Sequence, residues 1–326
     1  VPGLFYFGDS LLDVGNNNNL DTTAKANYPP YGIDFPLGPT GRFANGANLA
    51  DYIAALVGFP LGIAPFVNAT NADIVNGVNY ASGGGGILDN SGSNLGKVYS
   101  LDDQLDNHDS IISRLNNLVG IENTTELLSE SLYVSYIGSN DYINNYFIPN
   151  NTALRAAISP QTFATFVTTT YYFQLLRLYD CGARKVAVFG LGLIGCIPRE
   201  LYLYPPTAGE ACDDNINQAV EYFNTGVQSV VAALNILPGA NFTYINSFAI
   251  SEAPVPAGVN ATAPCCVVST SDGQCVEGST PCTVRDAHIF YDDFHPVSIF
   301  AQAIAGAAYS GPSPSIASPY SISQLI

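Results

Sequence analysis

The chain opens on Leu4-Phe5-Tyr6-Phe7-Gly8-Asp9-Ser10-Leu11, in which four apolar residues give way abruptly to a small polar turn. A short, continuous apolar run of this kind predicts a buried β-strand. Similar runs recur along the chain, separated by longer segments with helical spacing. Because strands alternate with helices, the sequence predicts an α/β fold with a parallel sheet covered on both faces. Strands are expected at residues 4–7, 77–81, 133–137, 185–189 and 242–245, and helices at 49–57, 111–118, 162–178, 216–237 and 298–309.

The composition is that of a globular chain with a large core. Of the 326 residues, 47% are hydrophobic and 11% are charged, so we expect the chain to fold and not to be disordered. We expect a single domain over residues 1–326. Residues 82–96, rich in glycine, asparagine and serine, are expected to form a loop. Residues 254–281 form the longest irregular segment, and their cysteines favour a disulfide-pinned excursion over a linker.

The charge balance and hydropathy limit the partners. The formal net charge is -17, and such a surface repels nucleic acid and anionic lipid headgroups while permitting a neutral substrate. The longest apolar stretch, at about residues 186–198, is broken by glycine and too short to cross a bilayer. We therefore expect neither a nucleic-acid partner nor a transmembrane segment.

Seven cysteines and five glycosylation sequons indicate the secretory route. The cysteine spacing lacks paired C-x-x-C knuckles, and disulfides fit it better than a metal site. Sequence alone does not choose among the possible pairings of six cysteines, and Cys181 is expected to be a buried free thiol. We expect a secreted protein whose chain starts, at Val1, as a processed mature protein would. The remaining cysteines are Cys196, Cys212, Cys265, Cys266, Cys275 and Cys282, and the sequons begin at Asn68, Asn123, Asn150, Asn241 and Asn260.

Small polar residues follow the first three predicted strands, at the sheet edge where open α/β proteins bind ligands. Ser10 is the candidate nucleophile, because a serine on a sharp turn after a strand can present its hydroxyl outward. The alternative is that Gly8-Asp9-Ser10 is an ordinary strand-to-loop turn. A serine hydroxyl is a weak nucleophile at neutral pH and needs a base.

Only three histidines can supply that base. His108 lies in a polar helical stretch and is expected to be exposed and inert, and His288 is open to a structural role. His295 follows Asp292 by three residues, so one turn of chain can bring the Asp292 carboxylate to Nδ1 and leave Nε2 for Ser10. Helix capping is the competing explanation of the Asp-x-x-His spacing, and Asp293 is the alternative carboxylate.

An acyl-transfer site also needs donors for the tetrahedral oxyanion. The candidates are the backbone N–H groups of Ser10 and Gly83 and the side-chain amide of Asn140. Gly83 is suitable because a glycine N–H can approach a substrate without an intervening Cβ. The competing explanations are a flexible glycine loop at Gly83 and a turn residue at Asn140.

One motif points to a different chemistry. Residues 190–195 match the dinucleotide fingerprint G-x-G-x-x-G and follow a predicted strand. Cys196-Ile197-Pro198 follows at once, so no helix opens at the third glycine, and the strand is the fourth rather than the first. We therefore favour a site without nicotinamide.

Taken together, these segments resemble the plant GDSL esterase/lipase family of the SGNH hydrolases. The resemblance runs nearly end to end, and six blocks in the family's order make it specific. Tyr291 and Leu193 replace the family's usual tryptophan and proline. The matching blocks are residues 7–17, 41–46, 77–84, 138–142, 190–198 and 290–296.

The resemblance implies a three-layer α/β/α sandwich with a flavodoxin-like, five-stranded parallel sheet, and no metal or cofactor. The family's namesake residues fall on Ser10, Gly83, Asn140 and His295, with Asp292 as the third triad member. The implied function is a secreted esterase or lipase that works through an acyl-enzyme on a small-molecule or polymer ester. Gly84 is an alternative to Gly83.

Two other functions stay open on the sequence. The acyl-enzyme could pass its acyl group to a polyol or polysaccharide, which would make the protein an acyltransferase. The chain could also be a secreted storage or defence glycoprotein with residual esterase activity. Short acyl esters, acetylated wall polysaccharides, cutin-type monomers and lipids are all possible substrates.

Overall fold

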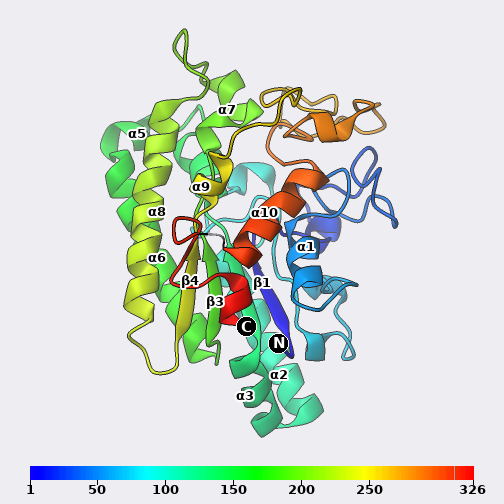
Figure 1. The fold of residues 1–326 in the computed structure, drawn as a ribbon, viewed down its shortest axis with the longest axis vertical. Coiled ribbons are helices and arrows are strands. Elements are labelled where there is room, and N and C mark those ends of the chain that lie inside the picture. Colours follow the sequence, from blue (N-terminus) through cyan, green and yellow to red (C-terminus); the bar gives the residue numbers. More distant parts are fainter. Residues whose placement is uncertain (312) are drawn as a thin grey trace.

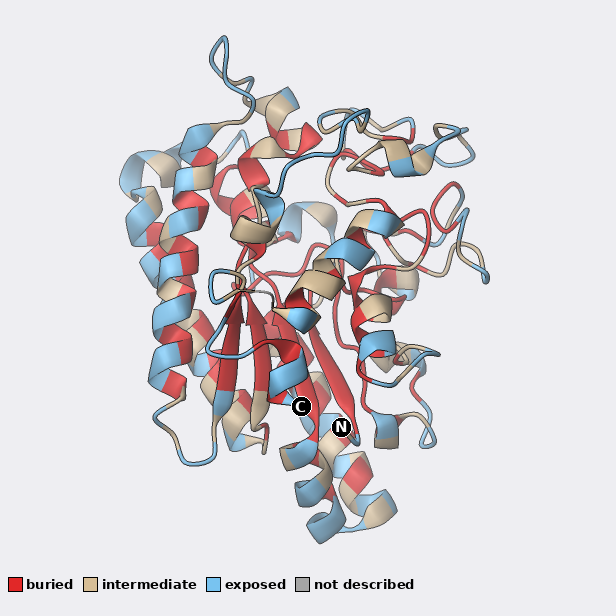
Figure 2. Ribbon diagram, viewed as in Figure 1, coloured by how far each residue is buried: buried red, intermediate tan, exposed pale blue. Residues whose placement is uncertain are grey.

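The computed structural model describes residues 1–311 and 313–326, and its centre is a five-stranded sheet (Figure 1). The strand order is β1-β2-β3-β4-β5. The first four strands are parallel and β5 pairs antiparallel with β4. Every residue of β1 and β2 is buried, as expected for parallel strands covered on both faces (Figure 2). The strands are β1 (Leu4–Gly8), β2 (Leu132–Tyr136), β3 (Lys185–Phe189), β4 (Asn241–Ile245) and β5 (Ala317–Ser318).

Helices cover both faces and make the expected α/β/α sandwich (Figure 1). α2, α6 and α8 pack together in one layer, and α1, α10 and α11 pack together in the other. Shorter helices lie in the connections. The helices are α1 (Leu49–Leu56), α2 (Leu101–Val119), α3 (Ile121–Glu130), α4 (Ser139–Asp141), α5 (Thr152–Ala157), α6 (Pro160–Asp180), α7 (Pro198–Leu203), α8 (Asp214–Leu234), α9 (Ser247–Ser251), α10 (Ser298–Ser310) and α11 (Ile322–Leu325).

Local sequence signals explain where the long helices begin. Ser100 caps α2 in a capping box, since its side chain accepts the Asp103 N–H while Asp103 bonds back to the Ser100 N–H. Asn48 and Asp51 form the same arrangement at α1. α6 starts with Pro160 at its first turn, where the missing N–H costs no helical hydrogen bond.

The prediction of a regular β-strand at residues 77–81 is wrong. The segment lies along the outer edge of β1, where the Tyr6 N–H bonds to Val78 O and the Tyr80 N–H bonds to Tyr6 O, but only isolated bridges form. Counting this segment, the parallel order becomes the flavodoxin-like 2-1-3-4-5. Gly77 makes the approach possible, because a Cβ there would lie 1.9 Å from Leu4 O.

His108 is buried, contrary to the expectation that it is exposed. It lies on the inner face of α2 among the rings of Phe5, Phe7, Tyr80 and Tyr133. Its Nδ1 is 2.9 Å from the Tyr80 hydroxyl. Burial lowers the pKa of His108 to about 3, so the imidazole is neutral and structural.

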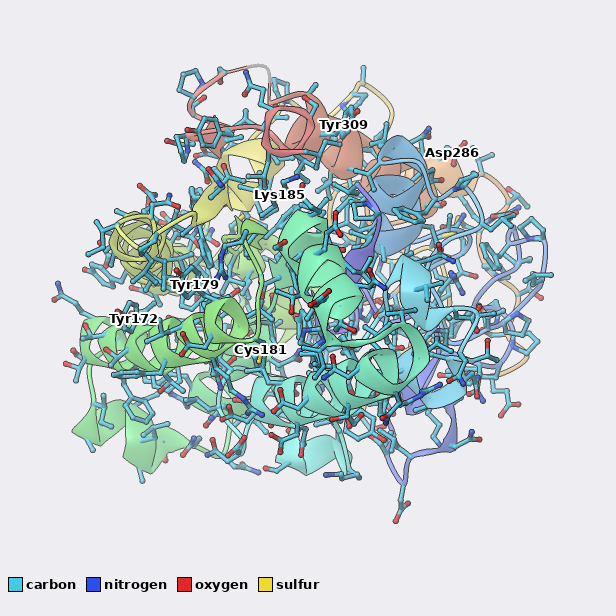
Figure 3. The ribbon with its side chains drawn as sticks, turned by 90° about the horizontal axis from the view of Figure 1, so that it is seen from below. Tyr172, Tyr179, Cys181, Lys185, Asp286 and Tyr309 are labelled. Atoms are coloured by element: carbon cyan, nitrogen blue, oxygen red, sulfur yellow. A yellow bond between two sulfur atoms is a disulfide. The ribbon has the colours of Figure 1, made fainter. Side chains whose placement is uncertain are left out.

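Three disulfides pair six cysteines. They join Cys196 to Cys212, Cys265 to Cys282 and Cys266 to Cys275. The last two pin the irregular segment at residues 254–281, as its cysteine content predicts. Cys181 is the free thiol but is only half-buried. It lies near Lys185, at the amino end of β3 (Figure 3). The expectation of a buried thiol is therefore wrong, because Cys181 lies in the turn that ends α6.

The G-x-G-x-x-G segment does not form a dinucleotide site. Its third glycine lies inside a 3-10 turn, Ile194–Cys196, and the disulfide to Cys212 follows directly. α7 begins only at Pro198. No helix N-terminus is therefore presented where a pyrophosphate would need one.

Candidate active site

Ser10 lies two residues beyond the end of β1, on a tight turn. The Asp9 N–H bonds to Tyr136 O of β2, and the N–H groups of Leu12 and Asp13 bond back to Asp9 O. This turn leaves Ser10 half-buried at the carboxyl edge of the sheet. A strand end in register with β2 thus holds the candidate nucleophile rigidly.

A continuous hydrogen-bonded relay joins Ser10, His295 and Asp292. Ser10 Oγ is 2.7 Å from His295 Nε2, and His295 Nδ1 is 2.8 Å and 2.7 Å from the two carboxylate oxygens of Asp292. His295 Nδ1 faces Asp292 and Nε2 faces Ser10, as the Asp-x-x-His spacing predicts. Such a relay can remove the proton of the serine hydroxyl and stabilise the imidazolium that forms.

The main chain around Asp292 explains why this carboxylate faces the imidazole. Asp292 Oδ1 accepts the N–H groups of Phe294 at 2.9 Å and His295 at 2.8 Å, which closes the chain into a turn. Asp293 points away, and its own N–H bonds to Gly273 O. Burial, reinforced by the charge of Asp292, raises the pKa of Asp293 to about 7. Asp293 therefore lies outside the relay.

Two of the three expected oxyanion donors are available. The Ser10 N–H has no acceptor among the described residues. The Asn140 amide donates one N–H to Gly85 O at 3.0 Å, and its carbonyl accepts from Asn144 at 2.7 Å. These two bonds orient the amide and leave its second N–H for a ligand.

The Gly83 N–H is not available in this structure, which goes against its expected role. It donates to the Asp13 carboxylate at 2.9 Å. Gly83 is instead required for packing, because a Cβ there would lie 2.6 Å from the ring of Phe43. The neighbouring Gly84 N–H has no acceptor within the described part of the chain, so Gly84 is the better candidate for the third donor.

The asparagine run at residues 16–19 holds the loop around Gly83 in place, a role that the sequence analysis did not predict. Asn16 donates to Asn79 O and Ala81 O. Asn17 donates to Gly83 O and accepts the Ser82 hydroxyl. An unusual cluster of side-chain amides directly after the Ser10 turn was the available signal, since buried amides must pair with backbone groups.

Tyr31 is a second residue that the sequence did not reveal. Its hydroxyl donates to Asp292 Oδ2 at 2.6 Å across a sequence separation of 261 residues. The sequence signal was the aromatic and proline-rich segment Tyr28-Pro29-Pro30-Tyr31. Nothing in its spacing indicated a contact with Asp292.

An apolar pocket adjoins the relay between α1 and α10. It is lined by Leu11 and Pro296, which directly follow Ser10 and His295, and by Phe43, whose ring centroid is 5.0 Å from that of His295. Leu49 and Ile304 close it from the two helices. No group of three histidine, cysteine or acidic side chains suited to a metal ion occurs among residues 1–311 and 313–326.

Comparison with known proteins identifies the family to which this chain is similar. A family model described as GDSL-like Lipase/Acylhydrolase matches residues 4–307. Two GDSL esterase/lipases of Arabidopsis thaliana are each 43% identical over 334 residues, with 100% of this chain and 92% of each relative covered. A third from the same plant is 42% identical over 329 residues.

The fold and its relatives define an α/β enzyme that hydrolyses carboxylic esters. The chain belongs to the GDSL-like lipase/acylhydrolase family, as the sequence blocks indicated. No helix in the described part of the chain is long and apolar enough to cross a membrane.

Proposed function

We propose that this protein is a secreted serine esterase in which Ser10, His295 and Asp292 form the catalytic triad. The observation that carries the proposal is the unbroken relay with contacts of 2.7–2.8 Å. The six disulfide-bonded cysteines support an oxidising compartment.

The reaction begins when Ser10 Oγ attacks the ester carbonyl and His295 Nε2 takes its proton. The carbonyl oxygen becomes an oxyanion, which the Ser10 N–H and the second Asn140 amide N–H stabilise. His295 then gives the proton to the departing alcohol as the carbon–oxygen bond breaks, leaving an acyl-enzyme. Water, deprotonated by His295, attacks this acyl-enzyme and releases the carboxylic acid and free Ser10.

The apolar residues Leu11 and Pro296, which directly follow Ser10 and His295, support an uncharged, apolar group next to Ser10. The pocket between α1 and α10 measures only about 20 Å³, enough for roughly one methyl-sized group. Burial of apolar surface is the driving force that such a lining offers, at about 25 cal/mol per Å².

The test is Ser10→Ala, assayed with p-nitrophenyl acetate and butyrate and with a fluorophosphonate probe. We expect turnover to fall at least about 10⁴-fold and labelling to disappear, while the fold is retained. Ser229→Ala, a change of an exposed serine on α8, is the matched control and should leave both unchanged. Turnover of Ser10→Ala within tenfold of the unmodified protein would refute the proposal.

A further inference from the structure

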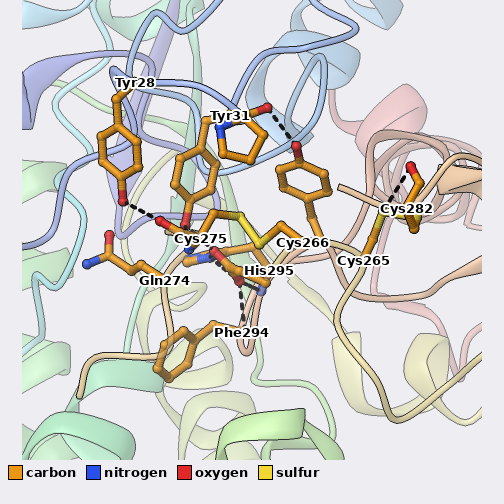
Figure 4. The surroundings of a disulfide bond; sticks show 12 residues. Tyr28, Tyr31, Cys265, Cys266, Gln274, Cys275, Cys282, Phe294 and His295 are labelled. Carbon is orange, nitrogen blue, oxygen red and sulfur yellow. Dashed lines mark hydrogen bonds and ion pairs between the residues drawn. A yellow bond between two sulfur atoms is a disulfide. The ribbon is translucent and has the colours of Figure 1, made fainter. Parts of the chain in front are cut away.

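Tyr31, the Cys266–Cys275 disulfide and His295 lie close together (Figure 4). Tyr31 is 1% exposed, and its hydroxyl donates to Asp292 Oδ2 at 2.6 Å. The same hydroxyl oxygen accepts the N–H of Cys275 at 3.1 Å. Cys275 is joined to Cys266, so the chain of contacts runs from the disulfide to Ser10.

The chemistry of Asp292 explains why a donor is needed there. The carboxylate is fully buried, and a buried charge is stable only when its oxygens are hydrogen-bonded. Backbone N–H groups serve Oδ1, whereas Tyr31 is the partner of Oδ2 besides the imidazole. Burial, together with the nearby Asp292 charge, raises the pKa of Tyr31 well above its usual value, so the hydroxyl stays protonated and donates.

Three contacts fasten the chain before Tyr31, two of them to the disulfide-bonded segment and one to Tyr291 beside Asp292. The Tyr291 hydroxyl donates to Pro30 O at 2.6 Å, the Tyr28 hydroxyl donates to Cys275 O at 3.1 Å, and the Gly278 N–H bonds to Pro29 O at 2.9 Å. All three contacts are made by the residues that directly precede Tyr31. Its position is therefore set by residues about 250 positions later in the sequence, as the separation of 247 residues between Tyr28 and Cys275 shows.

The disulfide also reaches the other side of Asp292. The Cys266 N–H bonds to Tyr291 O at 2.8 Å, one residue before Asp292. The Cys266–Cys275 bond thus links the main chain beside the carboxylate to the backbone group that orients the Tyr31 hydroxyl. Loss of this link would let the two move independently.

We propose that Tyr31 is a positioning residue for the triad carboxylate and that the Cys266–Cys275 disulfide holds Tyr31 against it. Tyr31 touches neither the substrate nor the reacting atoms, and acts by fixing the Asp292 carboxylate against His295 Nδ1. The inference rests on the proposed triad function.

The first experiment compares Tyr31→Phe with Tyr171→Phe in the full chain, using p-nitrophenyl butyrate. A hydrogen bond to a charged group contributes about 1.5–3 kcal/mol, so we expect kcat of Tyr31→Phe to fall about 10–100-fold. KM should change less than about threefold, because the lost contact serves the reacting groups and not substrate binding. Tyr171→Phe removes a buried hydroxyl that bonds to Ser135 at 2.7 Å and lies outside the contacts around Asp292, and it should retain kcat within about twofold.

The second experiment tests the role of the disulfide. The pair Cys266→Ser and Cys275→Ser should lower kcat about as much as Tyr31→Phe, and adding Tyr31→Phe should lower it little further, because both act on one contact. The neighbouring pair Cys265→Ser and Cys282→Ser is the control and should leave kcat within about threefold. Circular dichroism at the assay temperature confirms that each variant is folded.

The outcomes separate this inference from the function on which it rests. If the unmodified protein hydrolyses the ester, Ser10→Ala does not, and Tyr31→Phe keeps full kcat, the triad stands and the role of Tyr31 is refuted. Equal losses of kcat in Tyr31→Phe and Tyr171→Phe would likewise refute it. If Ser10→Ala is as active as the unmodified protein, the proposed function fails and the inference falls with it.

Discussion

Asp292 and Asp293 are adjacent carboxylates with different surroundings. Asp292 receives two backbone N–H bonds, a tyrosine hydroxyl and the imidazole. Asp293 receives no such set, and burial holds its pKa at about 7. The difference comes from the turn that Oδ1 of Asp292 closes, which directs one side chain inward and the next one away.

We predict that Asp292→Asn lowers kcat about 10³–10⁴-fold, because an amide cannot fix the imidazole tautomer in the same way. Asp293→Asn should lower kcat less than about tenfold. Steady-state hydrolysis of p-nitrophenyl butyrate by both variants checks the ranking. The reverse order would move the triad carboxylate to Asp293.

The carboxyl ends of β1 and β2 are lined with buried acids. Burial raises the pKa of Asp9 to about 7 and those of Asp13 and Asp141 to about 6. Hydrogen bonds from neighbouring loops offset the cost of burying two of these carboxylates. Asp13 accepts the Gly83 N–H, and Asp141 accepts the Ile87 N–H. Asp9 Oδ2, in contrast, has no partner among the described residues.

These raised values make stability depend on pH in a definite direction. The folded protein binds a proton at Asp9 more tightly than the unfolded chain, so this stabilisation is complete below about pH 4 and is lost as the pH rises towards 7. We predict that Asp9→Asn reduces the fall in free energy of unfolding between pH 4.5 and 7.5. The reduction is at most about 4 kcal/mol, since one pKa unit corresponds to about 1.4 kcal/mol.

Urea unfolding of the two proteins at both pH values measures this effect. Asp21→Asn, a change of an exposed acid, is the control and should leave the pH dependence as it is. An Asp9→Asn variant with the same pH dependence as the unmodified protein would contradict the prediction.

Across the whole molecule, the exposed surface combines a net charge of -17 with five sequons. The asparagines of all five are exposed, namely Asn68, Asn123, Asn150, Asn241 and Asn260. An exposed sequon in a protein of the secretory route is accessible to glycan transfer. The surface is therefore compatible with the glycosylation that the sequence predicts.

We predict that the protein, when expressed through a eukaryotic secretory pathway, carries N-linked glycans. Digestion with a peptide N-glycosidase should lower its mass, and replacing the five asparagines by glutamine should abolish the shift. An undigested mass equal to that of the bare polypeptide would contradict the prediction.

Short-range patterns were sufficient for much of the fold and of the site. The apolar runs predicted β1, β2, β3 and β4 because buried parallel strands need continuous apolar sequence. The predicted helices lie within or around α1, α2, α6, α8 and α10. The Asp-x-x-His spacing indicated the pairing of Asp292 with His295, because both groups lie on one turn of chain.

Only the tertiary structure decided the contacts between distant segments. It buries His108 on a helix whose polar sequence suggested exposure, and it gives the Gly83 N–H to Asp13 rather than to a ligand. It also pairs the cysteines and sets Tyr31 behind Asp292. Local spacing carries no information on these contacts, because each depends on how segments far apart in the chain pack in space.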